Sequence, residues 1–259
     1  MARKDGNFLR GVLGGLVFRV VNGKQRVSTR PGRIKQSRAT RISNQTFGKA
    51  SSLGGQIRKI LYINVENNFD PTAGSRLTAA LRKILGKCRN PETKRFDFQA
   101  DSFSAVRGFD FNIHSRMENQ MAVIPTVTAT DGTLQVSVNE IAVSKAFNFP
   151  SESFKCELKV SLSLYRLKEG LAYAKTESQG LEMTKYMELL AAHTFTFEVP
   201  DGCLCIVSMS LRFFNAGTTG WIPLYDKKIN PSCICGALVT PGTYQQDKRK
   251  RWVDMVRFE

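Results

Sequence analysis

Two cysteine pairs, Cys203-x-Cys205 and Cys233-x-Cys235, come closest to a chemical site in their type and spacing. Residues i and i+2 of a strand project to the same face, so two neighbouring strands could offer four thiolates to zinc, which favours tetrahedral sulfur ligation. Structural zinc sites usually leave about two to four residues between paired cysteines, on a turn. Both pairs lie in apolar runs instead, and cysteine is often buried as a small hydrophobic residue. We therefore expect core packing, with an inter-strand disulfide as the main alternative and zinc ligation as a lesser one, and we predict no metal site.

Enzymatic catalysis has little support among the other residues. The chain has two histidines, His114 and His193, and neither lies in a recognisable nucleophile context. The glycine-rich stretches at 11–15 and 51–55 match neither the dinucleotide-binding fingerprint nor the phosphate-binding P-loop. We expect these glycines to let the backbone pass close to another surface. The sequence thus predicts a protein that is not an enzyme, with no cofactor and no small-molecule substrate.

Positive charge is concentrated at the start of the chain. Residues 1–60 hold fourteen Lys and Arg and one acid, Asp5, a balance of +13, and residues 61–95 hold seven basic and three acidic residues, a balance of +4. Residues 96–259 hold seventeen basic and eighteen acidic residues, so this part is almost neutral. Such a front attracts anionic partners, whether nucleic acid, a membrane surface or an acidic protein.

Eleven basic residues of this front are candidate contacts to an anionic partner or a neighbouring subunit. Arginine outnumbers lysine among them, which suits bidentate contacts with phosphate or carboxylate. Contacts with phosphate would make binding salt-dependent and independent of base sequence, whereas an acidic surface on a neighbouring protein would serve equally well. The candidates are Arg3, Lys4, Arg10, Arg19, Lys24, Arg26, Arg30, Arg33, Lys35, Arg38 and Arg41.

A basic β-hairpin is predicted at 16–29, because Asn22-Gly23 separates two β-prone runs and favours a type I′ turn. The following residues, 33–44, are polar and show no hydrophobic periodicity. We expect this stretch to be extended or partly disordered until it is bound.

Two helices are predicted after this stretch. Apolar residues recur at helical spacing over 47–61, with Ser43 available as N-cap. A second helix has Asp70 as its expected N-cap and Pro71 in its first turn. Residues 1–95 are therefore expected to form one domain, made of a basic arm, the hairpin and two helices.

Residues 96–259 show strand patterns. The longest alternation, at 156–164, places apolar residues on one face and polar residues on the other, so we expect one face to be buried and the other to meet water. The predicted fold class is mainly β with a small α component (α+β), in which an antiparallel β-sandwich region, one large or two small sandwiches, follows the basic front. Further strands are predicted at Thr194–Val199, Cys203–Phe214, Cys233–Val239 and Trp252–Phe258.

The start of the chain lacks the pattern of a secretion signal. Arg10 and Arg19 interrupt its apolar stretch, and no small-residue cleavage site follows. No run approaches the roughly 18 apolar residues of a membrane span. We expect a soluble protein without a membrane span, cytoplasmic when synthesised or later released as part of an assembly.

Short motifs in the first 112 residues resemble an uncharacterised family of basic proteins, mostly from Bacteroidota. No activity is established for that family, so the resemblance implies a bacterial, soluble, non-secreted chain and assigns no functional residue. The motifs are Gly14-Gly15-Leu16-Val17-Phe18 with Gly23-Lys24 and Arg30, Phe47-Gly48-Lys49-Ala50-Ser51 with Ile57-Arg58, Ser75-Arg76-Leu77, and Gly108-Phe109-Asp110-Phe111-Asn112.

The change from basic to nearly neutral composition and the change to strand patterns coincide near residue 95. This suggests that residues 96–259 form a folded domain and that the basic residues 1–95 bind a partner. We expect a non-enzymatic structural or assembly subunit that forms a homo-oligomer or docks in a larger complex through this front. The alternative is a protein that binds nucleic acid without sequence specificity, through the same segment.

Overall fold

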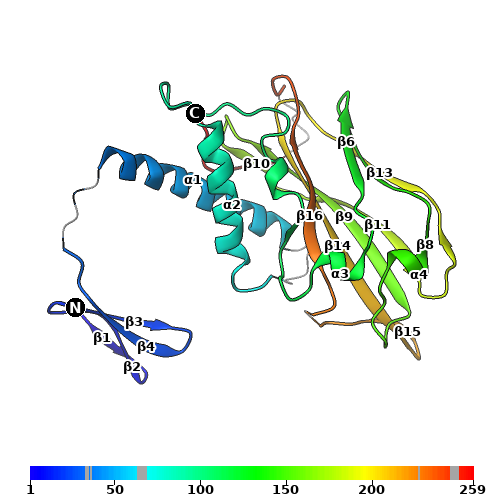
Figure 1. Cartoon of the computed structure of the whole chain (residues 1–259), viewed down its shortest axis with the longest axis horizontal. Helices are drawn as coiled ribbons and strands as arrows, with labels where there is room; N and C mark the ends of the chain where they lie inside the picture. Colours follow the sequence, from blue (N-terminus) through cyan, green and yellow to red (C-terminus); the bar gives the residue numbers. More distant parts are fainter. Residues whose placement is uncertain (33–34, 36, 63–68, 227, 246–250) are drawn as a thin grey trace. The chain divides into compact units, whose positions relative to one another are not determined.

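The computed structural model describes residues 1–32, 35, 37–62, 69–226, 228–245 and 251–259 (Figure 1). The chain divides into two compact units, Met1–Asn44 and Gln45–Glu259, and the division falls within helix α1 (Arg38–Leu61). The domain boundary expected at residue 95 lies inside the second unit. The chain is mainly β with a small α component, as the sequence predicts. None of the described helices is long and apolar enough to span a bilayer.

The first unit contains a four-stranded antiparallel sheet in which each strand pairs with the next. Asn22 and Gly23 both have positive φ, 52° and 73°, as a type I′ turn requires. The predicted hairpin is thus confirmed, and two earlier strands that the sequence did not predict extend it. The strands are β1 (Arg3–Asp5), β2 (Phe8–Leu13), β3 (Leu16–Val21) and β4 (Lys24–Thr29).

The side-chain amide of Gln25 hydrogen-bonds the backbone of β2 beyond the point where β2 stops pairing with β3. The pairing of β2 with β3 runs from Leu13 to Gly11, whose φ is 113°. Beyond that point, Gln25 of β4 takes over: the Leu9 amide donates to its Oε1 at 2.7 Å, and its Nε2 donates to the Leu9 carbonyl at 2.9 Å. Gln25 therefore satisfies the backbone amide and carbonyl of Leu9, which lies outside the part of β2 that pairs with β3.

The second unit is built on one large antiparallel sheet, ordered β17-β10-β9-β14-β16-β5, with β11 also paired to β9 and β15 to β14. A three-stranded sheet, β13-β7-β6, and a two-stranded one, β12-β8, complete the strands. The bounds are β5 (Phe109–Asp110), β6 (Thr126–Thr130), β7 (Thr133–Val138), β8 (Ile141–Ala142), β9 (Lys155–Arg166), β10 (Leu171–Tyr173), β11 (Glu177–Thr184), β12 (Leu189–Leu190), β13 (His193–Glu198), β14 (Leu204–Gly217), β15 (Gly220–Pro223), β16 (Ser232–Val239) and β17 (Trp252–Asp254). Three single-turn helices are η1 (Ser104–Val106), α3 (Met117–Gln120) and α4 (Val143–Ala146).

Two cores lie on opposite faces of the large sheet (Figure 1). On one face, Leu158, Val160 and their alternating neighbours pack against the three-stranded sheet, so the predicted sandwich is present. On the other face, helices α1 and α2 (Ala73–Cys88) pack around Tyr165. The polar face of β9 was expected to meet water, and this is wrong for Ser161, Ser163 and Tyr165, which are buried because the helical layer covers that part of the sheet.

Helix α1 begins earlier than the sequence indicates. Ser37 Oγ accepts a hydrogen bond from the backbone N–H of Thr40 at 3.1 Å, which caps the helix start. The expectation of an extended stretch up to residue 44 is therefore wrong from Arg38 onward, and Ser43 lies inside the helix instead of at its N-cap.

Helix α2 is confirmed, with Thr72 and not Asp70 at the N-cap position. Helix α1 contacts it at Gly54, where an added Cβ would make ordinary van der Waals contacts with Leu81 Cδ1 at 3.4 Å and with Thr78 Oγ1 at 3.5 Å. The expectation that the glycines of this stretch permit a close approach stays a prediction. The two helices consequently pack as one layer.

Candidate interaction surfaces

Most of the predicted contact residues lie on the sheet of the first unit. Arg30 follows β4, Lys35 lies in the connection to α1, and Arg41 is in the first turns of α1. These three side chains are exposed, whereas Arg33 and the side chain of Arg38 lie outside the described residues. The others are exposed on strands: Arg3 and Lys4 on β1, Arg10 on β2, Arg19 on β3, and Lys24 and Arg26 on β4.

One face of the β3–β4 hairpin is basic. Arg19 and Arg26 lie directly opposite each other in the register, and Lys24 projects to the same face as Arg26. Like charges in directly opposed positions destabilise a sheet. Asp5 is the single acid of residues 1–44, and its carboxylate pairs with Arg10 at 2.8 Å. The Arg19–Arg26 pair is thus left for an anionic group from outside the unit.

The other face of the same hairpin is mainly apolar, with Gln25 and Thr29 as its polar members. Leu16, Phe18 and Val20 of β3 share it with Val27 of β4, and Leu13 of β2 lies opposite Leu16. Leu13, Leu16 and Val27 are 57%, 42% and 51% exposed. None of the described residues of Met1–Asn44 is buried. We call Leu13, Leu16, Phe18, Val20 and Val27 the apolar face; a sheet normally buries such a face against another layer.

A second basic surface, which sequence reasoning missed, lies on helices α1 and α2. The two helices contain nine basic residues and no acid, and this imbalance was the signal that could have revealed it. A concave surface, here called the α1–α2 groove, lies between them. It is lined by Phe47, Ser51 and Arg58 from α1 and by Ser75, Arg82 and Lys83 from α2, among others.

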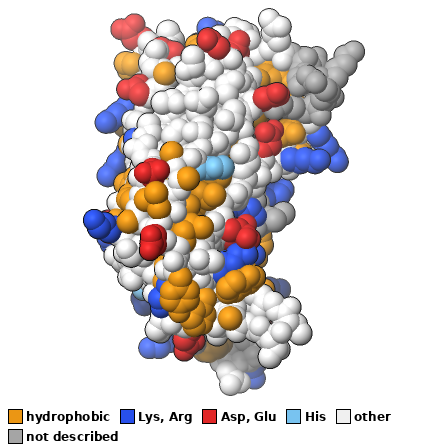
Figure 2. All heavy atoms as spheres, turned by 90° about the vertical axis from the view of Figure 1, so that its right-hand side faces the viewer, with side chains coloured by type: hydrophobic (Ala, Val, Ile, Leu, Met, Phe, Trp, Pro, Cys, Tyr) orange, Lys and Arg blue, Asp and Glu red, His pale blue; other side chains and the backbone are white. Residues whose placement is uncertain are grey.

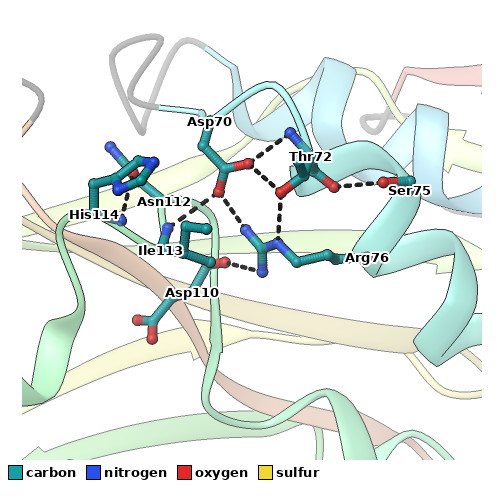
Figure 3. A network of polar contacts seen from close by, with 8 residues as sticks. All are labelled: Asp70, Thr72, Ser75, Arg76, Asp110, Asn112, Ile113 and His114. Atoms are coloured by element: carbon teal, nitrogen blue, oxygen red, sulfur yellow. Dashed lines mark hydrogen bonds and ion pairs between the residues drawn. The ribbon is translucent and has the colours of Figure 1, made fainter.

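A polar network fixes the start of α2, and hence one side of this groove (Figure 3). Asp70 Oδ1 accepts hydrogen bonds from the amide and the hydroxyl of Thr72, both at 2.6 Å. Its Oδ2 accepts from Arg76 Nη2 at 2.5 Å and from the Ile113 amide at 3.1 Å. Arg76 Nη1 also donates to the Asp110 carbonyl at 2.9 Å, so the network ties α2 to the edge strand β5.

The two aspartates of this region have opposite pKa shifts. Burial alone would raise the pKa of Asp70, but hydrogen bonds from Thr72, Ile113 and Arg76 hold it well below its usual range. At Asp110, burial raises the pKa above its usual value, although the Met117 amide donates to its carboxylate. Asp70 is therefore a stable anion that anchors the helix.

The second unit also exposes large aromatic side chains. Tyr186 is 76% exposed in the loop after β11, Trp221 is 46% exposed on β15, and Tyr225 is 84% exposed after it. The Nζ of Lys155 lies over the Trp221 ring, 5.6 Å from its centre. Figure 2 shows hydrophobic side chains gathered on one face of the molecule, between charged ones. Exposed aromatic residues of this kind are enriched in protein interfaces.

The four cysteines of the two Cys-x-Cys motifs are buried in the second unit. In the register, Cys205 faces Leu164 and Leu238, and Cys233 faces Met209, so the two pairs are not opposite each other. Burial raises the pKa of the Cys235 thiol to about 12. Within the described ranges, no group of three His, Cys, Asp or Glu side chains is placed to hold a metal ion.

The two histidines lie on other elements than these cysteines, His193 on β13 and His114 between β5 and α3. His193 lies on β13 with its ring 4.6 Å from that of Phe195, and the His114 amide donates to Asn112 Oδ1 at 2.9 Å.

Comparisons of the chain with models of protein families, with curated proteins and with solved structures found no match. The resemblance of the first 112 residues to a family of basic bacterial proteins stays a prediction.

Proposed function

We propose that the chain is a non-enzymatic structural or assembly subunit, which self-associates or docks in a larger complex through its basic unit Met1–Asn44. The observation that carries this proposal is that none of the described residues of the unit is buried, although its sheet gathers five apolar side chains on one face. Burying apolar surface contributes about 25 cal/mol per Å². A neighbouring subunit that covers the apolar face would therefore stabilise the unit.

The separation of the two faces supports protein docking. Because Arg19, Lys24 and Arg26 project to the opposite face, a partner can cover the apolar face without burying these charges. The exposed Trp221 and Tyr225 of the second unit give the chain further surface suited to protein contacts. Both units thus contribute surfaces of the kind found between subunits.

Removing apolar side chains from the apolar face should abolish assembly. We expect the full chain to form defined oligomers, and the triple variant L13T/L16T/V27T to remain monomeric, because threonine keeps the β-propensity and lowers the apolar area. Light scattering coupled to size-exclusion chromatography measures the mass of both proteins.

The matched control places the same substitution on the other face of the same strands. Val12, Val17 and Val21 project away from the apolar face, so V12T/V17T/V21T should assemble as the unchanged chain does. A monomeric full chain, or an L13T/L16T/V27T variant that assembles normally, would refute the proposal.

The direct opposition of Arg19 and Arg26 favours a second candidate function, binding of nucleic acid by the same unit without sequence specificity. A phosphate between the two guanidinium groups would relieve their repulsion. Under this proposal, R19Q/R26Q should lower the affinity for a duplex DNA probe on the order of tenfold at low salt and leave assembly intact. An unchanged affinity in a filter-binding titration would count against it.

A further inference from the structure

Strand β6 is an edge strand without the usual protection against pairing. It lies at the end of the sheet β13-β7-β6, and no strand among the described residues pairs with its outer side (Figure 1). Proteins normally protect such edges with charged residues, proline or bulges. The sequence of β6, Thr-Val-Thr-Ala-Thr, has no charge and no proline. The other described edge strands of more than two residues each contain one or the other: β1, β4, β11, β13, β15 and β17.

The side chains of β6 suit the addition of a further strand. Thr126, Thr128 and Thr130 are exposed, and threonine favours strands. Val127 projects to the opposite face and packs against the core of the second unit, next to Gly236. A strand added beyond β6 would therefore extend an outer row of threonines and an inner apolar face together.

The sequence of β6 is complementary to itself when two copies run antiparallel. If Thr128 lies opposite its counterpart in a second copy, Thr126 lies opposite Thr130 and Val127 opposite Ala129. Directly opposed side chains project to one face, so threonine meets only threonine and the apolar residues meet each other. Opposed threonines stabilise a sheet, and a two-fold axis through Thr128 would relate the two copies.

The ends of the strand favour this register. Centring on Val127 would place Pro125, which has no N–H to donate, opposite Ala129. Centring on Ala129 would place Asp131, which has a φ of 46° in the turn to β7, opposite Val127. A shift by one residue would bring threonines opposite apolar residues and mix the two faces. Only the register centred on Thr128 pairs all of β6.

We propose that β6 is an interface with a second copy of this chain, in which two β6 strands pair antiparallel about Thr128 and join their sheets. This contact lies in the second unit and goes beyond the docking proposed for Met1–Asn44. The pairing is short, so free chains should pair through it only at concentrations on the order of hundreds of micromolar. Copies that an assembly already holds together reach effective concentrations of about that size or higher, and there the pairing forms readily.

The test is crosslinking of variants with one added cysteine, by a thiol-specific reagent of about 8 Å reach. All variants carry C88S, because Cys88 is the one native cysteine that is not buried. T128C should form a covalent dimer, because its two thiols would lie about 5 Å apart. T196C is the matched control, since Thr196 is exposed in the same row of the sheet, across Gln135, but on the opposite edge strand β13. T128C should react at least about tenfold faster than T196C.

The register has a test of its own. T126C alone should crosslink poorly, because its two thiols would lie about 14 Å apart along the paired strands. A mixture of T126C with T130C should crosslink well, since these positions face each other across the two-fold axis.

Two protein concentrations separate this contact from the one proposed for the first unit. At about 10 µM, T128C should crosslink in the otherwise unchanged chain and not in the L13T/L16T/V27T background, which does not assemble. At about 500 µM it should crosslink in both. A chain that stays monomeric at the lower concentration would refute the proposed assembly, and the higher concentration would still test β6.

Charges at the centre of the pairing provide a second measurement. In the L13T/L16T/V27T background at about 500 µM, T128K and T128E should each weaken dimer formation at least about tenfold, because like charges would be directly opposed. An equimolar mixture of the two should restore it to within about threefold. Sedimentation equilibrium measures the dimer, and recovery on mixing requires that both variants are folded.

The inference would be overturned by any one of the following results. They are no crosslinking of T128C at either concentration, equal rates for T128C and T196C, crosslinking of T126C alone as fast as in its mixture with T130C, and no recovery on mixing T128K with T128E.

Discussion

Asp70→Asn is expected to lower the free energy of unfolding by about 3 kcal/mol at neutral pH. The Asp70 side chain is 2% exposed, and its carboxylate accepts four hydrogen bonds, from Thr72, Ile113 and Arg76. An asparagine has one acceptor oxygen in place of two, and it leaves the Arg76 guanidinium without its anionic partner. Urea unfolding followed by circular dichroism measures the loss.

The same residue should make stability depend on pH in acid. Because the folded-state pKa of Asp70 is lowered, its contribution is present above the unfolded pKa of about 3.9 and is lost as pH falls from there toward the folded pKa. We expect the difference between the unchanged chain and Asp70→Asn to shrink between about pH 5 and about pH 2. A difference that stays constant over this range would show that the charge of Asp70 is not what stabilises the helix.

Asp110→Asn is the matched control. Burial raises the pKa of Asp110 in the folded state above its value in the unfolded chain. The ionised carboxylate therefore lowers the stability of the fold at pH values above the folded-state pKa, and this loss disappears below the unfolded-state pKa. Asparagine can still accept from the Met117 amide, which lies 3.1 Å from Asp110 Oδ1. This variant should therefore keep or slightly gain stability at neutral pH. Equal losses in both variants would contradict the opposite roles assigned to the two aspartates.

Gly236→Ala should cost about 2 kcal/mol, because it overpacks the contact between β16 of the large sheet and β6 of the three-stranded sheet. A Cβ at Gly236 would lie 2.9 to 3.1 Å from three side-chain carbons of Val127 on β6. The register of β16 against β14 also shifts next to this position, between Val207 and Ser208, so the backbone there is held by a bulge. Thermal unfolding of the variant measures the cost.

Val127 provides the test of this explanation. In the double variant V127A/G236A, the clashing methyl groups are gone, so most of the lost stability should return. Gly180→Ala is the matched control within the same sheet, since its nearest neighbour is the flexible carboxylate of Glu157 at 3.1 Å. That substitution should cost less than about 0.5 kcal/mol. A Gly236→Ala variant as stable as Gly180→Ala would exclude a close approach at Val127.

Local patterns predicted the elements whose signals are contained in a few neighbouring residues. Asn22-Gly23 fixed the hairpin, and the alternation at 156–164 identified the strand that became β9. The burial of Ser161 and Tyr165 could not be read in this way, because helices α1 and α2, from a distant part of the chain, cover them. Whether the polar face of a strand meets water depends on tertiary packing and not on the strand's own period.

For the interaction surfaces, too, the local sequence predicted some features, while others depend on tertiary structure. The sequence identified the basic residues of the first unit, but the segregation of its faces depends on the register of β3 with β4, which brings Arg19 opposite Arg26 and Phe18 opposite Val27. The α1–α2 groove could have been suspected from helices without acids. Its position between α1 and α2, however, depends on how the two helices pack against each other.

The order of strands in the first unit has a consequence for aggregation. Strand β4 is an edge of its sheet, and an exposed edge is a template onto which another chain can add a strand and start a fibril. Lys24 and Arg26 lie on this edge strand, and bringing two such edges together would place like charges side by side. Repulsion between the charges of Lys24 and Arg26 on two such edges thus disfavours edge-to-edge aggregation while the apolar face is exposed.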